Sequence, residues 1–174
     1  MAHDNVLIRD KVLPLRACAG IMLLNRFGQV WIGRRAPKWL ADKSGCIWQM
    51  PQGGLSGDER PVDAALRELE EETGATSVEL AGEIQGWLTY ELPPHLLGVA
   101  LKGRYRGQKQ RWFAMRFLGP DSEISIRPRK GLKAEFDAWR WAAIDEVPDL
   151  VPAFKRGIYE TVVAEFGHLA RSNA

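Results

Sequence analysis

The sequence predicts a single domain of the α/β class, and three observations support this prediction. Its 174 residues, 45% hydrophobic and 26% charged, suffice for one domain with a sizeable core and are few for two. Short apolar or alternating stretches, bounded by glycine and proline, are typical of strands and recur along the chain. A helix behind a glycine turn and an amphipathic helix at the end can both pack on a sheet.

The first strands are expected soon after a loose lead-in of residues 1–12, within a domain of residues 13–170. From Arg16, ACAGIMLLN predicts a buried strand, RFGQ a turn that carries Gly28, and VWIGRR a second strand, so that a hairpin is expected. APKWLADKSG is loop-like, and CIWQMP leads to the glycine turn. Gln52 precedes this turn, where it either contacts substrate or orders the loop.

A short helix is predicted from Pro61 to Thr73. Proline is tolerated in the first helical turn, and Gly74 suits the position just past the helix end. An apolar stripe for packing on a sheet comprises Val62, Ala65, Leu66 and Leu69.

Three glutamates share one face of this helix. At about 100° per residue, Glu68, Glu71 and Glu72 stand at about 0°, 300° and 40° around the axis, and Glu70 points to the opposite side. Three like charges this close are costly unless a cation compensates them, and oxygen ligands suit magnesium or manganese. For an ELEEE run taken alone, the alternative is a solvated helix face.

A fixed pattern of glycines, glutamates and one arginine contains this helix face. It comprises Gly53, five residues, Glu59, seven residues, Arg67, Glu68, an aliphatic residue, one residue, Glu71, Glu72, one residue, Gly74 and Ala75. The pattern matches the Nudix box at every defined position, so the chain resembles a Nudix hydrolase. The resemblance implies an α/β/α sandwich on a mixed sheet, and hydrolysis of a nucleoside diphosphate linked to another group.

The resemblance also implies that Glu68, Glu71 and Glu72 bind a divalent metal, Mg²⁺ or Mn²⁺. Such ions would bridge phosphate oxygens and lower the pKa of an attacking water. We expect Arg67 to orient the carboxylates, paired with Glu71 at i,i+4 or with Glu59 in the loop.

The remaining elements follow in order. SVELAGEIQGWLTYEL is strand-forming up to Pro93 and Pro94, and WFAMRFLG predicts another strand. DAWRW predicts a strand with the rings of Trp139 and Trp141 on one face. PAFKRGIYETVVAEFGHLA predicts an amphipathic helix whose apolar face comprises Ile158, Val162, Phe166 and Leu169.

Two segments are strongly basic. Such a run is usually a solvated loop, but beside a metal–carboxylate site it can supply counter-charge for a polyphosphate chain. We expect Lys109 to contact substrate in this way. The first segment contains Lys102, Arg104, Arg106, Lys109 and Arg111, and the second Arg127, Arg129, Lys130 and Lys133.

The outer segments carry a narrower resemblance. WLTYELP, GQKQRWF, AEFDAWRW and FKR are similar to stretches of bacterial RNA 5′-pyrophosphohydrolases and of asymmetric diadenosine tetraphosphate hydrolases from bacteria and plants. The resemblance implies that Glu135 reaches the metal site from a loop, so that Glu71, Glu72 and Glu135 are all candidates for the general base. It further implies a nucleotide path that comprises Arg16, Arg35, Tyr90, Phe154 and Lys155. For the aromatic residues, packing in the core is the alternative.

The choice of substrate stays open between 5′-triphosphorylated RNA and diadenosine tetraphosphate. Leu15 and Ala17 flank Arg16 where enterobacterial RNA enzymes have tyrosine and proline, and the segment between Arg35 and Trp48 is longer than theirs. Another nucleoside diphosphate derivative, such as ADP-ribose, and a non-catalytic nucleotide- or RNA-binding module are the alternatives. Because no glutamate of the box is missing, the sequence favours an enzyme.

Composition indicates the setting. A net charge of +2 is too small to identify a nucleic-acid binder. Cys18 and Cys46 lack metal-ligand spacing and are expected to be buried free thiols in a reducing cytosol. Without an apolar run of signal-peptide or membrane-span length, a soluble cytoplasmic protein is expected, and nothing in the composition indicates an obligatory protein partner.

Overall fold

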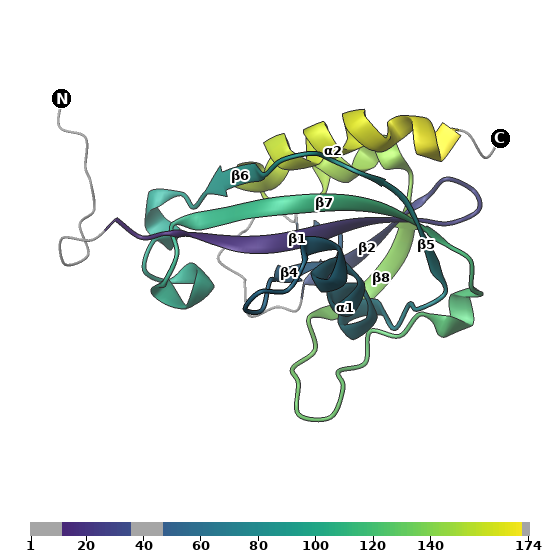
Figure 1. The fold of residues 1–174 in the computed structure, drawn as a ribbon, viewed down its shortest axis with the longest axis horizontal. Helices are drawn as coiled ribbons and strands as arrows, with labels where there is room; N and C mark the ends of the chain where they lie inside the picture. Colours follow the sequence, from purple (N-terminus) through teal and green to yellow (C-terminus); the bar gives the residue numbers. More distant parts are fainter. Residues whose placement is uncertain (1–11, 36–46, 172–174) are drawn as a thin grey trace.

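The computed structural model describes residues 12–35 and 47–171. A mixed sheet lies between helix α1 on one face and helix α2 on the other (Figure 1). The strands are β1 Leu15–Leu24, β2 Val30–Arg35, β3 Trp48–Gln49, β4 Gln52–Gly54, β5 Val78–Glu83, β6 Leu88–Glu91, β7 Gly107–Phe117 and β8 Phe136–Ala142. The α-helices are α1 Pro61–Thr73 and α2 Ala153–Arg171, and short 3₁₀ helices are η2 Pro94–Leu96, η3 Ala100–Gly103, η4 Asp121–Glu123 and η5 Ile144–Asp149.

Strand β1 is the inner strand on which the site is built. It runs parallel to β7 from the Leu15–Gly107 pair to the Leu24–Arg116 pair. All residues of β1 from Cys18 to Leu24 are buried, whichever face of the sheet they point to, as is usual for an inner strand of a parallel pair. The α/β/α sandwich expected from the sequence is thereby confirmed.

The hairpin expected from β1 and β2 is confirmed only at its turn. The two strands pair at Leu24 and Val30, and β2 then diverges to pair with β8 and β3. Because β1 is left open on that side, β4 pairs with it, with Gly54 opposite Cys18. The divergence therefore brings the glycine turn beside β1.

Alternate residues of β1 enter the two cores. Ile21 and Leu23 pack on the α1 side, whereas Met22 and Leu24 pack on the α2 side. The predicted apolar face of α2 is confirmed, with Ile158, Val162 and Phe166 buried and Leu169 partly buried.

The apolar stripe of α1 differs from the expected one at two positions. Ala65 and Leu69 are buried as predicted, but Ala64 is buried too, and Leu66 is 42% exposed. Small residues let α1 approach the sheet closely, which leaves the larger Leu66 at the margin. The two rings of β8 share a face as expected, since the ring centroids of Trp139 and Trp141 are 6.0 Å apart.

Other expectations concern the termini and the thiols. Cys18 is buried and free, and burial raises the pKa of its thiol to about 11, whereas Cys46 lies outside the described residues. Most of the expected lead-in also lies outside them, so the boundary at residue 12 stays a prediction. None of the helices in the described ranges has the length and apolar character needed to cross a membrane.

Candidate active site

At the glycine turn of β4, side chains from α1 and β1 pack directly against the glycine backbone. A Cβ atom on Gly53 would overlap the carboxyl group of Glu68, and one on Gly54 would overlap the guanidinium of Arg16. Glycine at both positions therefore lets α1 and β1 approach the turn closely. Gly74 has a second role, since its φ of 75° ends α1 and its N–H donates to Glu70 O at 2.9 Å.

Arg67 connects the turn to the glutamates of α1. Its Nε and Nη2 lie 2.8 and 2.9 Å from the two carboxylate oxygens of Glu59, and Nη2 also donates to Gly54 O at 2.9 Å. Its Nη1 lies 2.8 Å from Glu68 Oε1 and 3.5 Å from Glu71 Oε2. Both pairings considered from the sequence are thus present, and Arg67 lowers the pKa of Glu59 to about 2.

Glu72 is a partly buried carboxyl group that contacts the backbone of the glycine turn. Its Oε2 accepts a hydrogen bond from the backbone N–H of Gln52 at 3.1 Å. Burial raises its pKa well above the usual value, and the charges of Glu135 and Glu68 raise it further. Burial also raises the pKa of Glu68, where Arg67 opposes the shift. Ionising these groups together is costly without an added cation.

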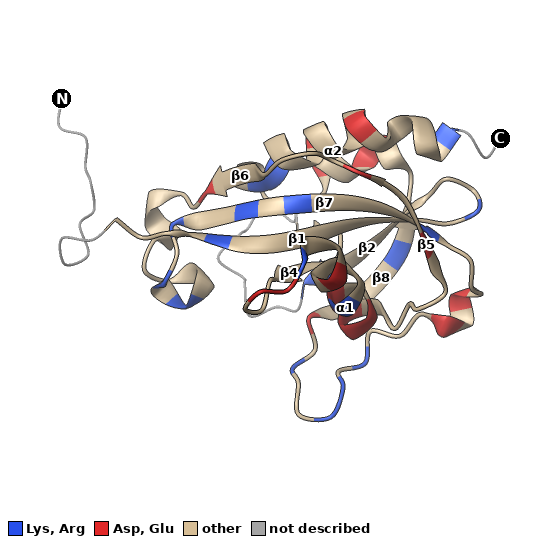
Figure 2. Ribbon diagram, in the orientation of Figure 1, with Lys and Arg blue, Asp and Glu red and all other residues tan. Residues whose placement is uncertain are grey.

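A pocket of about 180 Å³ lies between α1 and the loop that precedes β8. All four glutamates expected at the metal site line it, together with basic residues from the loop. Figure 2 shows acidic α1 above this loop, on which blue segments alternate with tan ones. The lining residues are Glu68, Glu71, Glu72, Ile126, Arg127, Pro128, Arg129, Leu132, Lys133 and Glu135.

The donor set suits a hard divalent cation, although the side chains are not yet arranged around one. As they stand in residues 12–35 and 47–171, no three acidic, histidine or cysteine side chains converge in a metal-binding geometry. In this arrangement Glu68 and Glu71 pair with the guanidinium of Arg67. Carboxylates that line one pocket and raise one another's pKa still supply the oxygens that Mg²⁺ and Mn²⁺ prefer.

A cluster of cations and amides extends from the pocket toward α2. Arg35 Nη1 lies 3.0 Å from Glu135 Oε1, which connects β2 to the loop carboxylate. Arg35 Nη1 and Lys155 Nζ each lie 3.4 Å from Gln49 Oε1. Burial, together with the neighbouring charge of Arg35, lowers the pKa of Lys155 to about 8.

Two aromatic rings border this cluster. The centroids of Tyr90 and Phe154 are 5.5 Å apart, and Lys155 Nζ lies 5.7 Å from the Tyr90 ring centre. Tyr90 is only 7% exposed and packs in the core on the α2 side. The structure thus brings together Arg35, Tyr90, Phe154 and Lys155, and it places the Tyr90 ring mainly in the core.

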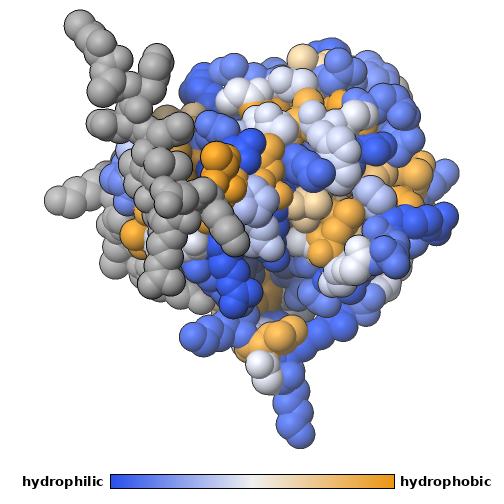
Figure 3. Space-filling view, turned by 60° about the vertical axis from the view of Figure 1, so that its left-hand side comes forward, coloured by the Kyte–Doolittle hydropathy of each residue, from blue (hydrophilic) through white to orange (hydrophobic). Residues whose placement is uncertain are grey.

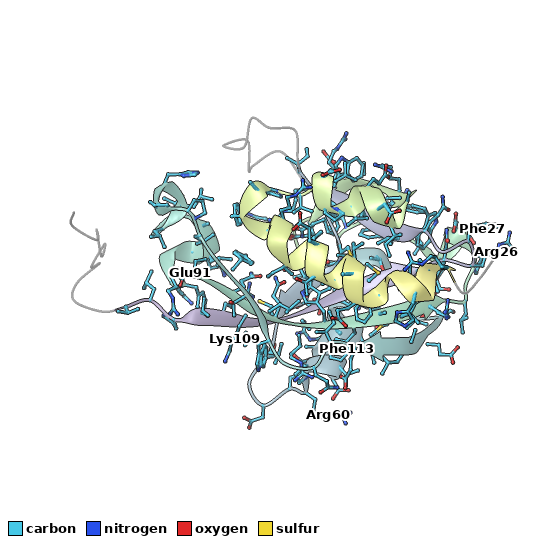
Figure 4. The ribbon with its side chains drawn as sticks, turned by 90° about the horizontal axis from the view of Figure 1, so that it is seen from above. Arg26, Phe27, Arg60, Glu91, Lys109 and Phe113 are labelled. Atoms are coloured by element: carbon cyan, nitrogen blue, oxygen red, sulfur yellow. The ribbon has the colours of Figure 1, made fainter. Side chains whose placement is uncertain are left out.

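Lys109 lies elsewhere. Its Nζ stands 4.9 Å from the ring centre of Trp87, which is 40% exposed. It alternates along β7 with the buried Gln108 and Gln110, so it points from the opposite face of the strand. Figure 4 labels it beside β7. The structure therefore does not bring Lys109 together with Lys155.

The sequence interpretation missed a row of buried amides. Gln110 Nε2 donates to Gln52 Oε1 at 2.6 Å and to Gln108 Oε1 at 2.8 Å, and Trp112 Nε1 donates to Gln110 Oε1 at 2.9 Å. For Gln52, which also holds Glu72, these contacts favour ordering of the loop. Glutamines two residues apart on an apolar strand were the available signal.

Comparison with known proteins agrees with this architecture. The chain matches the family model described as NUDIX domain over residues 14–162. A protein from Agrobacterium fabrum described as RNA pyrophosphohydrolase is 53% identical over 166 residues, or 94% of this chain and 98% of that protein. One from Brucella abortus with the same description is 53% identical over 167 residues, or 94% of each chain.

Solved structures share the fold. The MutT protein from Methanosarcina mazei aligns with a TM-score of 0.61 and 18% identity over 89% of this chain and 97% of that one. An Ap4A hydrolase binary complex from C. elegans aligns with a TM-score of 0.60 and 16% identity over 88% of this chain and 99% of that one. From the family match and the relatives at 53% identity, the chain belongs to the Nudix hydrolase family.

Proposed function

We propose that this protein removes pyrophosphate from 5′-triphosphorylated RNA in the cytoplasm, with Mg²⁺ or Mn²⁺ as cofactor and without an obligatory protein partner. The observation that carries the proposal is the 53% identity, over nearly the whole chain, to relatives described as RNA pyrophosphohydrolases. A complete cluster of acidic residues supports it, since Glu68, Glu71 and Glu72 line one pocket with Glu135.

In this proposal the four pocket glutamates hold the cation. When bound, a divalent ion would polarise phosphate oxygens and favour ionisation of the attacking water. Arg67 orients Glu68 and Glu71 from its anchor on Glu59 and Gly54 O. The proton of the water passes to Glu71, Glu72 or Glu135, each of which lines the pocket.

The cluster near α2 binds the nucleotide end of the substrate. Arg35 and Lys155 supply positive charge for the phosphate next to the ribose, and Phe154 offers a half-buried ring to the first base. Arg16 lies against Gly54 at the edge of the same turn. The contact between Lys109 and Trp87 forms a separate point where a longer RNA chain can bind.

Lys155 predicts a pH dependence of substrate binding. With a pKa of about 8, its ammonium group is charged below that pH and neutral above it, so its attraction for phosphate is lost as pH rises. KM for triphosphorylated RNA should rise about tenfold between about pH 7 and 9. In Lys155→Arg the guanidinium stays charged, and the rise should be absent. Equal pH profiles for both proteins would contradict this role.

The test of the function is hydrolysis of triphosphorylated RNA and diadenosine tetraphosphate side by side at matched concentration. We expect faster conversion of the RNA to its 5′-monophosphate with release of pyrophosphate, dependent on magnesium. The dinucleotide is the second candidate, because Leu15 and Ala17 stand where the enterobacterial RNA enzymes have tyrosine and proline. Faster release of ATP and AMP would establish the dinucleotide as the substrate. Turnover of neither substrate would contradict both.

A further inference from the structure

The loop from Ile124 to Glu135 is tied to α1 on two sides of the pocket. At its start, the N–H of Ser125 donates a hydrogen bond of 2.8 Å to the carbonyl oxygen of Thr73, which is the last residue of α1. In its middle, Arg129 Nη2 lies 2.7 Å from Glu70 Oε1 on the outward face of the helix. These anchors fix the loop across from the pocket glutamates.

The cations of this loop differ in their surroundings. Arg127, Arg129 and Lys133 line the pocket, whereas Lys130 does not. Arg129 is already paired with Glu70, but among the described residues the side chains of Arg127 and Lys133 form no ion pair. The loop projects at the bottom of the molecule, where Figure 3 shows a largely hydrophilic surface around a small apolar patch. Within this loop, Leu132 is the exposed large apolar residue, at 56%.

We propose that Arg127 and Lys133 form a subsite for the terminal phosphates of the substrate, the part that leaves as pyrophosphate. The inference rests on the proposed function, in which Arg35 and Lys155 hold the nucleotide end. Glu135 lies between the two regions, because it lines the pocket and also pairs with Arg35. A triphosphate whose nucleotide end lies at Arg35 and which extends past the pocket glutamates would place its terminal phosphates near Arg127 and Lys133.

The subsite has a chemical role in the reaction. The oxygen of water bonds to the phosphorus next to the ribose, and the bond from that phosphorus to the bridging oxygen breaks. The electron pair leaves with pyrophosphate, and the proton of the water passes to a carboxylate of the pocket. Negative charge therefore grows on the leaving group, and Arg127 and Lys133 stabilise it as it develops.

The test compares Arg127→Ala/Lys133→Ala with Lys130→Ala, a control that removes a charge from the same loop outside the pocket. Calorimetric titration with inorganic pyrophosphate in the presence of magnesium should show affinity lowered about tenfold or more in the double variant. The control should match the wild type. Arg127→Lys/Lys133→Arg, which keeps both charges, should retain most of the affinity.

Turnover gives a second measurement. The double variant should lose more kcat/KM on triphosphorylated RNA than on diphosphorylated RNA, because the latter has one phosphate fewer to contact. If the double variant binds pyrophosphate as tightly as the wild type does, the subsite is overturned, even where the wild type hydrolyses RNA as proposed. Failure of the wild type to hydrolyse RNA would contradict the proposed function, while the titration would still decide the subsite. All changed side chains are exposed, so the thermal unfolding midpoint should stay unchanged.

Discussion

Glu72→Gln should lower kcat for triphosphorylated RNA about 1,000-fold or more while leaving the protein folded. Glutamine has nearly the same shape and keeps an oxygen that can accept the hydrogen bond from Gln52 N–H. It lacks the negative charge with which the carboxylate binds a divalent cation or accepts a proton from water. A steady-state assay with Glu79→Gln, an exposed residue of β5, as the matched control measures the effect. Unchanged turnover in Glu72→Gln would count against the assignment of α1 as the catalytic helix.

The same variant should be at least as stable as the wild type in a buffer that contains a chelator. Burial raises the pKa of Glu72, so the folded state binds its proton more tightly than the unfolded state does. The wild type therefore loses stability as pH rises from the usual glutamate pKa through the raised value. Glutamine carries no such penalty. Thermal unfolding at acidic and at neutral pH should show the variant gaining stability relative to the wild type as pH rises.

Arg67→Ala should damage both turnover and stability. Four acceptors lose a hydrogen bond from the guanidinium: Glu59, Glu68, Glu71 and Gly54 O. The side chains of Glu59 and Glu68 are only 17% and 14% exposed, so they are left as like charges with restricted access to water. We expect kcat to fall about 100-fold because the carboxylates lose their orientation.

The stability part of this prediction has its own signature. The thermal unfolding midpoint of Arg67→Ala should fall by about 5 °C or more in chelator. Added magnesium should recover part of the loss, because a cation replaces the missing positive charge. Arg67→Lys should lie between the two, since it keeps the charge without the forked geometry that reaches Glu59 and Gly54 together. Unfolding midpoints equal to that of the wild type would contradict the account of Arg67.

Local rules predicted the elements that depend on neighbours in sequence. Pro61 and Gly74 bounded α1 correctly because proline suits a helix start and a left-handed glycine suits its end. The hairpin of β1 and β2 was predicted only in part, since a fully apolar strand does not reveal which neighbour it pairs with. Pairing with β7, far along the chain, is a tertiary choice.

In the site, too, some features follow from local sequence and others from tertiary structure. Glu68, Glu71 and Glu72 share a face of α1 because helical periodicity requires it, and all three line one pocket. The hydrogen bond from Gln52 to Glu72, the row of amides through Gln110, and the position of Lys109 over Trp87 follow from strand register. No spacing within the sequence encodes that register. A run of cations likewise did not show which of them face the pocket.

The most direct test of the proposed metal site is Mn²⁺ binding measured by electron paramagnetic resonance on the wild type and on Glu72→Gln, with Glu79→Gln as the control. The account predicts that the wild type and the control bind the ion equally well and that Glu72→Gln binds it at least about tenfold more weakly. Equal Mn²⁺ affinity in all three proteins would contradict the placement of the metal on the glutamate face of α1.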